Sequence, residues 1–308
     1  MDLRQLAAVV AVVEHRSFSA AARSLHTVQS NVSTHVARLE RELAVTLIDR
    51  TTGAPTEVGI AVVDRARRVQ AELDALVADV ASMNHETTGV TRVGVIGTTA
   101  RWLVSQLLVA LARAYPRVQA VVVDATTTSL LPQVLNGRLD LAVVALPVRD
   151  PDLESHELFK EELMVVAPLA HPLAAYQRVT LAELAEHELL LEPPGTAFRD
   201  DLDSQARLAG LRLRPQAEVD GMRLLASLAF EGFGAAILPA SAVPPVGFGG
   251  TAGGWTRVAI DGVVGRTVGV VTRRRGLPSA PTRALREVLV RVVTDQAARQ
   301  PGLHVVHE

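Results

Sequence analysis

The sequence predicts a protein of mixed α/β class, with helices in its first part and alternating strands and helices after residue 89. Apolar residues recur every three or four positions as far as residue 83, which is the spacing of one helix face. Beyond residue 89, near-continuous apolar segments such as "RVGVIG" and "VQAVVVD" alternate with helical stretches, as in parallel sheets covered on both faces. A chain of 308 residues is long enough for two domains, each with its own core.

The first sixty residues predict three helices followed by a turn. One face of the first helix consists of Leu3, Leu6, Val10 and Val13. Ser17 or Ser19 can cap a short second helix, "AAARSL", because a serine hydroxyl accepts a hydrogen bond from a free helical N–H. We expect Thr27 to cap a third helix. The inner face of that helix consists of Val32, Val36, Leu39 and Leu43. Thr51 and Gly53 then suit a turn between two extended segments.

Residues 62–83 predict a long helix with an apolar seam. The seam consists of Val62, Ala66, Val69, Leu73, Leu76, Val80 and Met83, at intervals that alternate between four and three residues. This heptad spacing is typical of helices that pair with one another. Because the other positions are largely charged, we predict a linker helix that dimerises through the seam. The alternative is an amphipathic helix that packs on its own domain.

The chain after residue 89 predicts two α/β subdomains. In the first, "RVGVIG", "VQAVVVD" and "LDLAVV" are expected strands, whereas residues 102–114 and "LLPQVL" are expected helices. The pattern restarts at "LMVVAPLAHPL" and reaches "EGFGAAILP". A further strand, "RTVGVVTR", precedes a closing helix over residues 282–295. We therefore expect the chain to cross between the subdomains near residue 162 and again near residue 266.

The composition excludes several kinds of chemistry. The chain has no cysteine, which excludes disulfides, thiolate metal sites and cysteine nucleophiles. Its net charge of −2 argues against indiscriminate nucleic-acid binding, so any DNA binding depends on the local placement of charge. The N-terminus has no basic run before its apolar stretch, which Glu14, His15 and Arg16 interrupt, and this predicts neither a signal peptide nor a membrane span. No catalytic arrangement of carboxylates or of Ser, His and Asp emerges, and we expect no metal ion and no cofactor.

Residues 3–50 resemble the LysR-type transcriptional regulators. They carry the family's S-F-x-x-A-A-x-x-L, Q-x-x-V-S-x-x-V and L-E-x-x-L elements at the family's spacing. The C-terminal region matches more loosely, through "YPRVQAVV", "LLPQVLNGRLDLAVV" and "EGFGAAILP". The chain departs from the pattern at Ala44, where the family usually has Gly, and at Ile48, where it usually has Phe. The turn "TTGAPTEV" is shorter than the family's wing and has no arginine.

The resemblance implies three parts. Residues 1–61 are expected to form a winged helix-turn-helix DNA-binding domain, residues 62–88 a linker and dimerisation helix, and residues 89–308 an effector-binding domain. The last is expected to be two-lobed, like a type 2 periplasmic binding protein. Lobe I would then comprise residues 91–162 and 267–296, and lobe II residues 163–266.

The resemblance also explains why the outer face of the third helix is short and polar. Surface helices usually carry Glu, Lys and Arg, which are better helix formers. Short side chains that donate and accept hydrogen bonds let a helix enter the major groove and reach base edges and phosphates. Gln29 suits adenine, and Arg38 and Arg50 suit phosphate oxygens. The expected DNA-binding residues are Thr27, Gln29, Ser30, Asn31, Ser33, Thr34, Arg38, Arg50 and Thr51.

The effector is expected between the lobes, at the carboxyl ends of the strands. "GTTARW" follows the first strand and opens a helix, so Thr98 and Thr99 with free backbone N–H groups can hold a carboxylate. The alternative is that these threonines are only helix caps. The expected effector-binding residues are Thr98, Thr99, Ala100, Arg101, Thr127, Thr128, Gly195, Thr196 and Phe198.

The sequence therefore predicts a cytoplasmic, sequence-specific DNA-binding regulator whose promoter binding is modulated by a small-molecule effector, a carboxylate or another anion. Its expected partners are double-stranded promoter DNA, further copies of the chain in a homodimer or homotetramer, and RNA polymerase, with no membrane. The alternative is a cytoplasmic solute-binding module or an enzyme on the same two-lobed fold. Because the N-terminal motif has no use in an enzyme, it favours the regulator.

Overall fold

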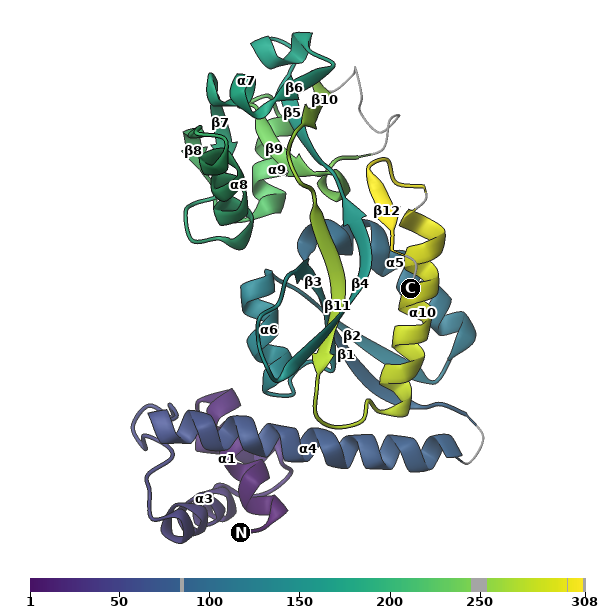
Figure 1. Ribbon diagram of the computed structural model, residues 1–308. Coiled ribbons are helices and arrows are strands. Elements are labelled where there is room, and N and C mark those ends of the chain that lie inside the picture. The colour runs from purple at the N-terminus through teal and green to yellow at the C-terminus, as the bar shows by residue number, and fades with distance from the viewer. Residues whose placement is uncertain (84–85, 245–253, 298, 307–308) are drawn as a thin grey trace.

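The protein consists of an N-terminal helical domain, a long linker helix and two α/β lobes, which follow one another from bottom to top in Figure 1. The computed structural model describes residues 1–83, 86–244, 254–297 and 299–306. The expected linker (62–88) and the expected lobe II (163–266) each include residues outside these ranges. The first helices are α1 (Leu3–His15), α2 (Phe18–Ser24), α3 (Gln29–Leu43) and α4 (Glu57–Met83).

Side chains cap two of the three N-terminal helices. The Asp2 carboxylate accepts from the Gln5 N–H at 2.9 Å at the start of α1. Ser17 caps α2 by accepting from the Ala20 N–H at 3.3 Å, which confirms one of the two expected serines. The expectation for Thr27 is wrong: α3 begins one residue later, with Val28 at its N-cap. The Thr27 hydroxyl instead accepts from the side-chain amide of Asn31 at 3.0 Å, and no side chain caps α3.

The core of the N-terminal domain lies between α1, α3 and the first turns of α4. Its buried apolar residues include Val9, Val12, Val32, Val36, Leu39, Leu47, Ile48, Val63 and Ala66. After α3 the chain makes a short wing, in which Ile48 and Pro55 form an isolated antiparallel bridge. Gly53 at the tip has φ +66°, and a Cβ there would lie 2.6 Å from the carbonyl oxygen of Arg16. The wing can therefore fold back on α1 only with glycine at this position.

Helix α4 is a single helix from Glu57 to Met83, so it begins before the expected residue 62. Its first turns belong to the N-terminal domain, because Val63 and Ala66 are buried in that core. Its second half lies along the base of lobe I, next to α10 (Ala280–Ala297). The helix therefore connects the two domains directly. Within the described ranges, no helix is both long and apolar enough to span a membrane.

Lobe I is built on a mixed six-stranded sheet of order β12-β4-β11-β3-β1-β2. Its strands are β1 (Gly89–Val95), β2 (Val118–Asp124), β3 (Leu141–Leu146), β4 (Leu153–Glu161), β11 (Arg266–Arg273) and β12 (Leu303–Val305). Strands β2 and β3 pair parallel with β1, whereas β11 pairs antiparallel with β3 and β4. The helices of this lobe are α5 (Gly97–Ala114), α6 (Thr127–Leu135) and α10. Leucines and valines of α5, α10 and the central strands form its core.

Lobe II is built on a second six-stranded sheet, of order β6-β10-β5-β9-β7-β8. Its strands are β5 (Leu163–Pro168), β6 (Arg178–Thr180), β7 (Glu188–Leu191), β8 (Arg214–Glu218), β9 (Ala236–Pro239) and β10 (Trp255–Asp261). Its helices are α7 (Leu181–Ala185), α8 (Ala197–Leu208) and α9 (Met222–Phe230), with short 3-10 turns η1 (Pro172–Ala175) and η2 (Ala240–Ala242). The chain passes between the sheets at Glu162, between β4 and β5, and returns between β10 and β11. The sequence analysis named neither β4, "LESHELFKE", nor β12.

Candidate functional site

The outer face of α3 is exposed, while its inner face is buried. Val32, Val36 and Leu39 are enclosed by the N-terminal core. The exposed residues on the other side are Gln29, Ser30, Asn31, Thr34 and Arg38, and Ser33 is half-buried beside them. The expected recognition residues of this helix therefore share one solvent-facing surface. Such a surface can approach base edges without displacing any apolar residue.

Ser19 on α2 orients the first of these side chains. Its hydroxyl donates to Gln29 Oε1 at 2.7 Å, and both residues are exposed. An amide held in this way presents its –NH₂ group in a defined direction before DNA binds. The sequence predicts Ser19 only as a possible helix cap, because the geometry of the nine residues between Ser19 and Gln29 decides whether the two side chains meet.

Arg50 lies at the start of the wing and is already paired. Its Nη2 is 2.5 Å from Glu40 Oε2, and its guanidinium stacks 5.1 Å from the centroid of the Phe18 ring. The next residues are ordered by Asp49, whose carboxylate accepts from the Thr51 N–H at 2.7 Å. Hydrogen bonds from the backbone of Thr51, and then of the next residue, hold the pKa of Asp49 below its usual value. Arg50 and Thr51 are both exposed, and a phosphate at Arg50 would compete with Glu40.

The seven seam residues of α4 do not share one environment. Ala66 is only 1% exposed, in the N-terminal core, and Val62 packs partly against that core. A partner chain therefore cannot reach Ala66, because the start of the seam packs on its own domain. The remaining five are exposed to solvent: Val69, Leu73, Leu76, Val80 and Met83. The alternative interpretation, an amphipathic helix that packs on its own domain, therefore holds for Val62 and Ala66.

A polar cluster joins the two lobes through Arg266, the first residue of β11. Its Nε lies 2.5 Å from Glu161 Oε1, and the Glu161 side chain is fully buried. Its Nη2 donates to Thr98 Oγ1, at the start of α5, at 2.6 Å. On the lobe II side, the Arg266 guanidinium lies 6.0 Å from the centroid of the Phe198 ring. Thr98 and Phe198, predicted separately, therefore approach the same arginine.

The other expected residues of α5 occupy different environments. Thr99 is completely buried, and its hydroxyl has no hydrogen-bond partner among the described residues. A ligand between the lobes cannot touch this side chain without a rearrangement. Ala100 is half-buried against the core of lobe I. Arg101 is exposed and donates to the backbone carbonyl of Ser241 at 3.0 Å, so it connects α5 with η2.

The expected residues of α6 belong to its first turn. Thr126 caps the helix by accepting from the Ser129 N–H at 3.3 Å. Its hydroxyl also contacts that of Thr128 at 3.0 Å, and Thr128 is exposed. Thr127 is half-buried and accepts from the Ala145 N–H at 3.3 Å. Of this pair, Thr128 is therefore the residue that a ligand can reach.

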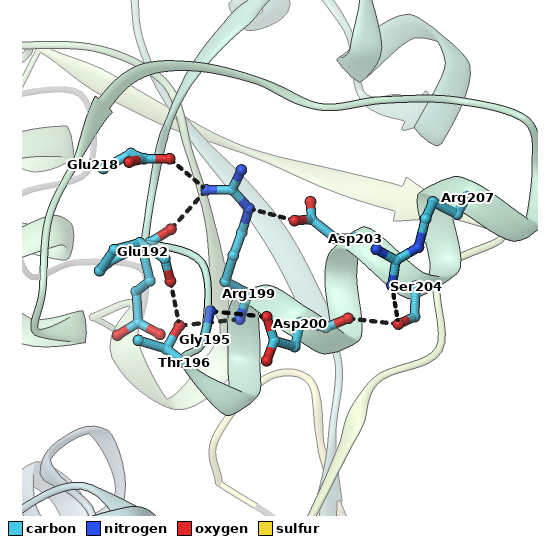
Figure 2. A network of polar contacts seen from close by, with 10 residues as sticks. Glu192, Gly195, Thr196, Arg199, Asp200, Asp203, Ser204, Arg207 and Glu218 are labelled. Carbon is cyan, nitrogen blue, oxygen red and sulfur yellow. Dashed lines mark hydrogen bonds and ion pairs between the residues drawn. The ribbon is translucent and has the colours of Figure 1, made fainter.

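On lobe II, Thr196 and Gly195 order the loop before α8. Thr196 caps the helix by accepting from the Arg199 N–H, and the Gly195 N–H donates to Asp200 at 3.0 Å. Figure 2 shows that Arg199 lies at the centre of a polar network. It donates to the Glu192 carbonyl at 2.7 Å and pairs with Asp203 and Glu218, all of lobe II. Arg199 is therefore a buried structural residue, and its charge is not free to bind an effector.

Glu192, just after β7, is an acid that the sequence analysis did not select. Burial raises the pKa of its carboxyl above the usual value, and the repulsion of Asp220 adds to this. A hydrogen bond with Thr196 and the charge of Arg266 partly oppose the increase. Glu161, Glu192 and Arg266 escaped selection because they stand far apart in the sequence and belong to no local motif.

Two cavities lie elsewhere on the lobes, although Glu161 of this cluster borders one of them. One, of about 900 Å³, is bounded by the strands that connect the lobes and by residues 301–304. The other, of about 480 Å³, lies between α4 and the base of lobe I. Neither is lined by an expected effector residue. Across the ranges that the structure describes, no group of three or more His, Cys, Asp or Glu residues is arranged to hold a metal ion.

Two family models match the chain. The model described as "Bacterial regulatory helix-turn-helix protein, lysR family" covers residues 3–60. The model described as "LysR substrate binding domain" covers residues 84–294. The matched ranges correspond to the N-terminal helical domain and to the two lobes. Together they cover the candidate DNA-binding and effector residues, whereas the seam residues of α4, at positions 62–83, lie between the two matched ranges.

Similar proteins extend over nearly the whole chain. The "DNA-binding transcriptional dual regulator OxyR" of Escherichia coli K12 is 31% identical over 305 residues, 95% of each chain. A protein of Streptomyces viridosporus named "Probable hydrogen peroxide-inducible genes activator" is 36% identical over 247 residues, covering 79% of this chain and 78% of its own. Among solved structures, a full-length Pseudomonas aeruginosa OxyR, in which aspartate replaces a cysteine, matches with a TM-score of 0.76 and 25% identity. That match covers 100% of this chain and 98% of the other.

Proposed function

The chain belongs to the LysR family of bacterial regulators, and on this basis we propose which of its residues bind DNA, effector and partner chain. It is a DNA-binding transcriptional regulator with an effector-binding domain, like its relatives, and not an enzyme. As a member of the family it binds promoter DNA and a small molecule and acts as an oligomer. Because its target is chromosomal DNA, we propose that it acts in the cytoplasm, with RNA polymerase as a further partner. We also propose the division into residues 1–61, 62–88 and 89–308.

The observation that carries the DNA-binding proposal is the exposed polar face of α3. A helix-turn-helix reads bases with the first residues of its second helix. Gln29, the first residue of α3, is held by Ser19 and is proposed to read adenine through its amide. Arg38 and Arg50 are proposed to contact phosphates, with Ser30, Asn31, Ser33, Thr34, Thr27 and Thr51 completing the contact surface.

A gel shift with the DNA upstream of the protein's own gene tests this proposal. Losing a base contact costs about 1–3 kcal/mol and relaxes discrimination at one base pair. Gln29→Ala should therefore bind its preferred site more weakly and tolerate substitutions at one position. The matched control is Gln119→Ala, the same change at an exposed residue of β2. If Gln29→Ala weakened binding to all sequences equally, Gln29 would have another role.

We propose that the effector binds where Thr98, Arg266 and Phe198 approach one another. The arginine offers guanidinium N–H groups, the threonine a hydroxyl and the phenylalanine an apolar surface, which together suit a small carboxylate with an apolar part; because Glu161 already pairs with Arg266, that carboxylate would compete with Glu161. Thr128, Thr196 and Arg101 are proposed to border this site. The other expected residues are proposed to support the site without contacting the effector through their side chains: Gly195, Ala100, Thr127 and Thr99. Thr99 cannot contact the effector directly, because it is completely buried.

The names of the relatives refer to hydrogen peroxide, but this chain cannot respond to peroxide in the same chemical way if that response uses a thiol. Oxidation to a sulfenic acid or a disulfide requires a cysteine. This chain has none, whereas the P. aeruginosa structure carries a cysteine replacement. We propose that the chain is controlled by a reversibly bound molecule instead. Treatment with hydrogen peroxide should then leave its DNA affinity unchanged.

A further inference from the structure

Helix α4 is fastened to lobe I by a carboxylate. Asp79 Oδ1 accepts from the N–H of Ala280 at 2.7 Å. Ala280 is the first residue of α10, so Asp79 satisfies one of the free N–H groups of that helix from a different part of the chain. Arg283, one turn further along α10, lies 3.3 Å from the same oxygen. This contact is polar and joins residues more than 200 positions apart.

Lobe I is shaped to let α4 come close. A Cβ on Gly276 would lie 2.8 Å from Glu72 Oε1 of α4, and Gly276 has φ +92°. A Cβ on Gly89, with φ +128°, would lie 3.3 Å from the Cβ of Ala78. Ala78 is buried at this contact. A Cβ on Gly89 would require Ala78 to shift by a few tenths of an ångström, whereas the flexible Glu72 side chain can move away from a Cβ on Gly276.

The contact is nevertheless not packed like a core. A cavity of about 480 Å³ lies between α4 and the lobe. The helix contributes four alanines and Val77 to the cavity wall, and the lobe contributes both apolar residues, such as Val90 and Leu277, and charged ones, such as Arg92. Because the cavity leaves these apolar side chains unpacked, the polar contact of Asp79 is an important part of what holds the two together.

The other end of α4 is held more firmly. Val63 and Ala66 are buried in the N-terminal core, and Arg67, itself buried, pairs with Glu14 at 3.2 Å. The helix therefore moves with the DNA-binding domain, and its contact with lobe I is the weaker end. At about 100° per residue, Ala78 lies on the side of α4 opposite the seam, about 200° from Leu76, whereas Asp79 borders the seam, about 60° from Leu76.

We propose that this contact is a releasable joint, that Asp79 is its positioning residue, and that lobe I changes the direction of the DNA-binding domain through it. The joint itself is independent of where the effector binds. Its role in regulation rests on the function proposed above.

Cysteine labelling measures the joint directly, because the chain has no other thiol. Ala78→Cys places a thiol at the contact, and its reaction with a maleimide requires the joint to open. The matched control is Val77→Cys, since Val77 is the neighbouring residue and is 69% exposed. In the full-length protein, Cys at position 78 should react at least tenfold more slowly than Cys at position 77. Equal rates would overturn the proposal.

Asp79→Ala then tests the clamp. Loss of a helix-capping carboxylate should raise the labelling rate at position 78 by about 2- to 30-fold and leave the rate at position 77 unchanged. Asp79→Asn keeps an acceptor for Ala280 and should rescue most of the protection. Ala229→Cys, buried in lobe II, serves as a check for global unfolding and should stay protected in every background. An unchanged rate at position 78 in Asp79→Ala would overturn the role of Asp79.

Hydrogen exchange and footprinting complete the test without any cysteine. Asp79→Ala should increase exchange of the Ala280 N–H and alter the length of DNA protected from nuclease, with little change in affinity for a single half-site. An unchanged footprint together with faster exchange would show that the joint opens without affecting DNA, which overturns its regulatory role. If the parent protein binds no DNA at all, the proposed function fails, whereas the labelling result still decides whether the joint exists.

Discussion

Replacing Leu76 with glutamate should weaken self-association, if the exposed part of the α4 seam is an interface between copies of the chain. Leu76 is 61% exposed and lies in the middle of this part of the seam. Full burial of a leucine side chain contributes about 1.5–3 kcal/mol, so burying the exposed part contributes about 1–2 kcal/mol per chain. A symmetric dimer contains two copies, so their loss raises Kd by roughly 30- to 900-fold.

The assay is sedimentation velocity over a series of protein concentrations. Ile60→Glu is the matched control, because Ile60 is also a large apolar residue of α4, is 52% exposed and lies about 160° around the helix from Leu76. We expect Leu76→Glu to shift the protein to a smaller species and Ile60→Glu to sediment like the parent. If the two variants behave alike, then the seam is not the interface. If Leu76→Glu remains dimeric at low concentration, contacts outside α4 suffice for dimerisation.

Three further predictions concern DNA, effector and pH. Gln29→Ala should relax discrimination at one base pair, whereas Arg50→Gln should weaken all sequences alike and lower the salt slope by about one, as measured by gel shifts at several salt concentrations. Thr98→Val combined with Thr128→Val should keep the basal DNA affinity and lose the thermal shift that small carboxylates produce in the parent; an unchanged shift would place the effector elsewhere. Because burial raises the pKa of Glu192 in the folded state, folding binds protons there, and stability should fall as pH rises from about 4.5 through the folded pKa. Glu192→Gln should remove this fall in urea unfolding experiments at a series of pH values, and a variant with the same pH profile as the parent would contradict the assignment.

The sequence predicted well where a pattern is local. The strand "RTVGVVTR" is β11 without a shift of either end, and "VQAVVVD" is β2. Both are rich in valine, which favours an extended backbone, although β11 is buried or half-buried throughout whereas β2 is an edge strand with three exposed residues. Strand β4 was missed because "LESHELFKE" alternates charged and apolar residues, and its role depends on pairing with β11 and β12. Pairing over such distances leaves no local signal.

Periodicity also cannot tell what a face packs against. Ala66 and Leu73 obey the same heptad spacing, yet the first is buried in the N-terminal core and the second is exposed. Likewise, the sequence does not show whether the hydroxyl of a threonine at the start of a helix binds a ligand or another residue of the protein. Thr98 accepts from Arg266, which lies 168 positions away, and Thr99 points to no described partner. Tertiary contacts decide these cases.

The contacts between the lobes differ enough in strength to indicate how the lobes move. The buried carboxylate of Glu161 in lobe I accepts from the N–H of Ser241, in η2 of lobe II, at 3.1 Å, and a hydrogen bond to a charged group contributes about 1.5–3 kcal/mol. Arg223 of α9 and Asp124 at the end of β2 also connect the lobes, at 2.6 Å, but the Arg223 side chain is 68% exposed. An exposed pair contributes only about 0.2–1 kcal/mol. The lobes should therefore separate on the side of Asp124 and turn about the contact between Glu161 and Ser241. To offset the loss of that exposed pair, an effector must bind the separated lobes more tightly than the closed lobes by about 1 kcal/mol. A larger difference in binding free energy is needed to shift most of the molecules to the separated state.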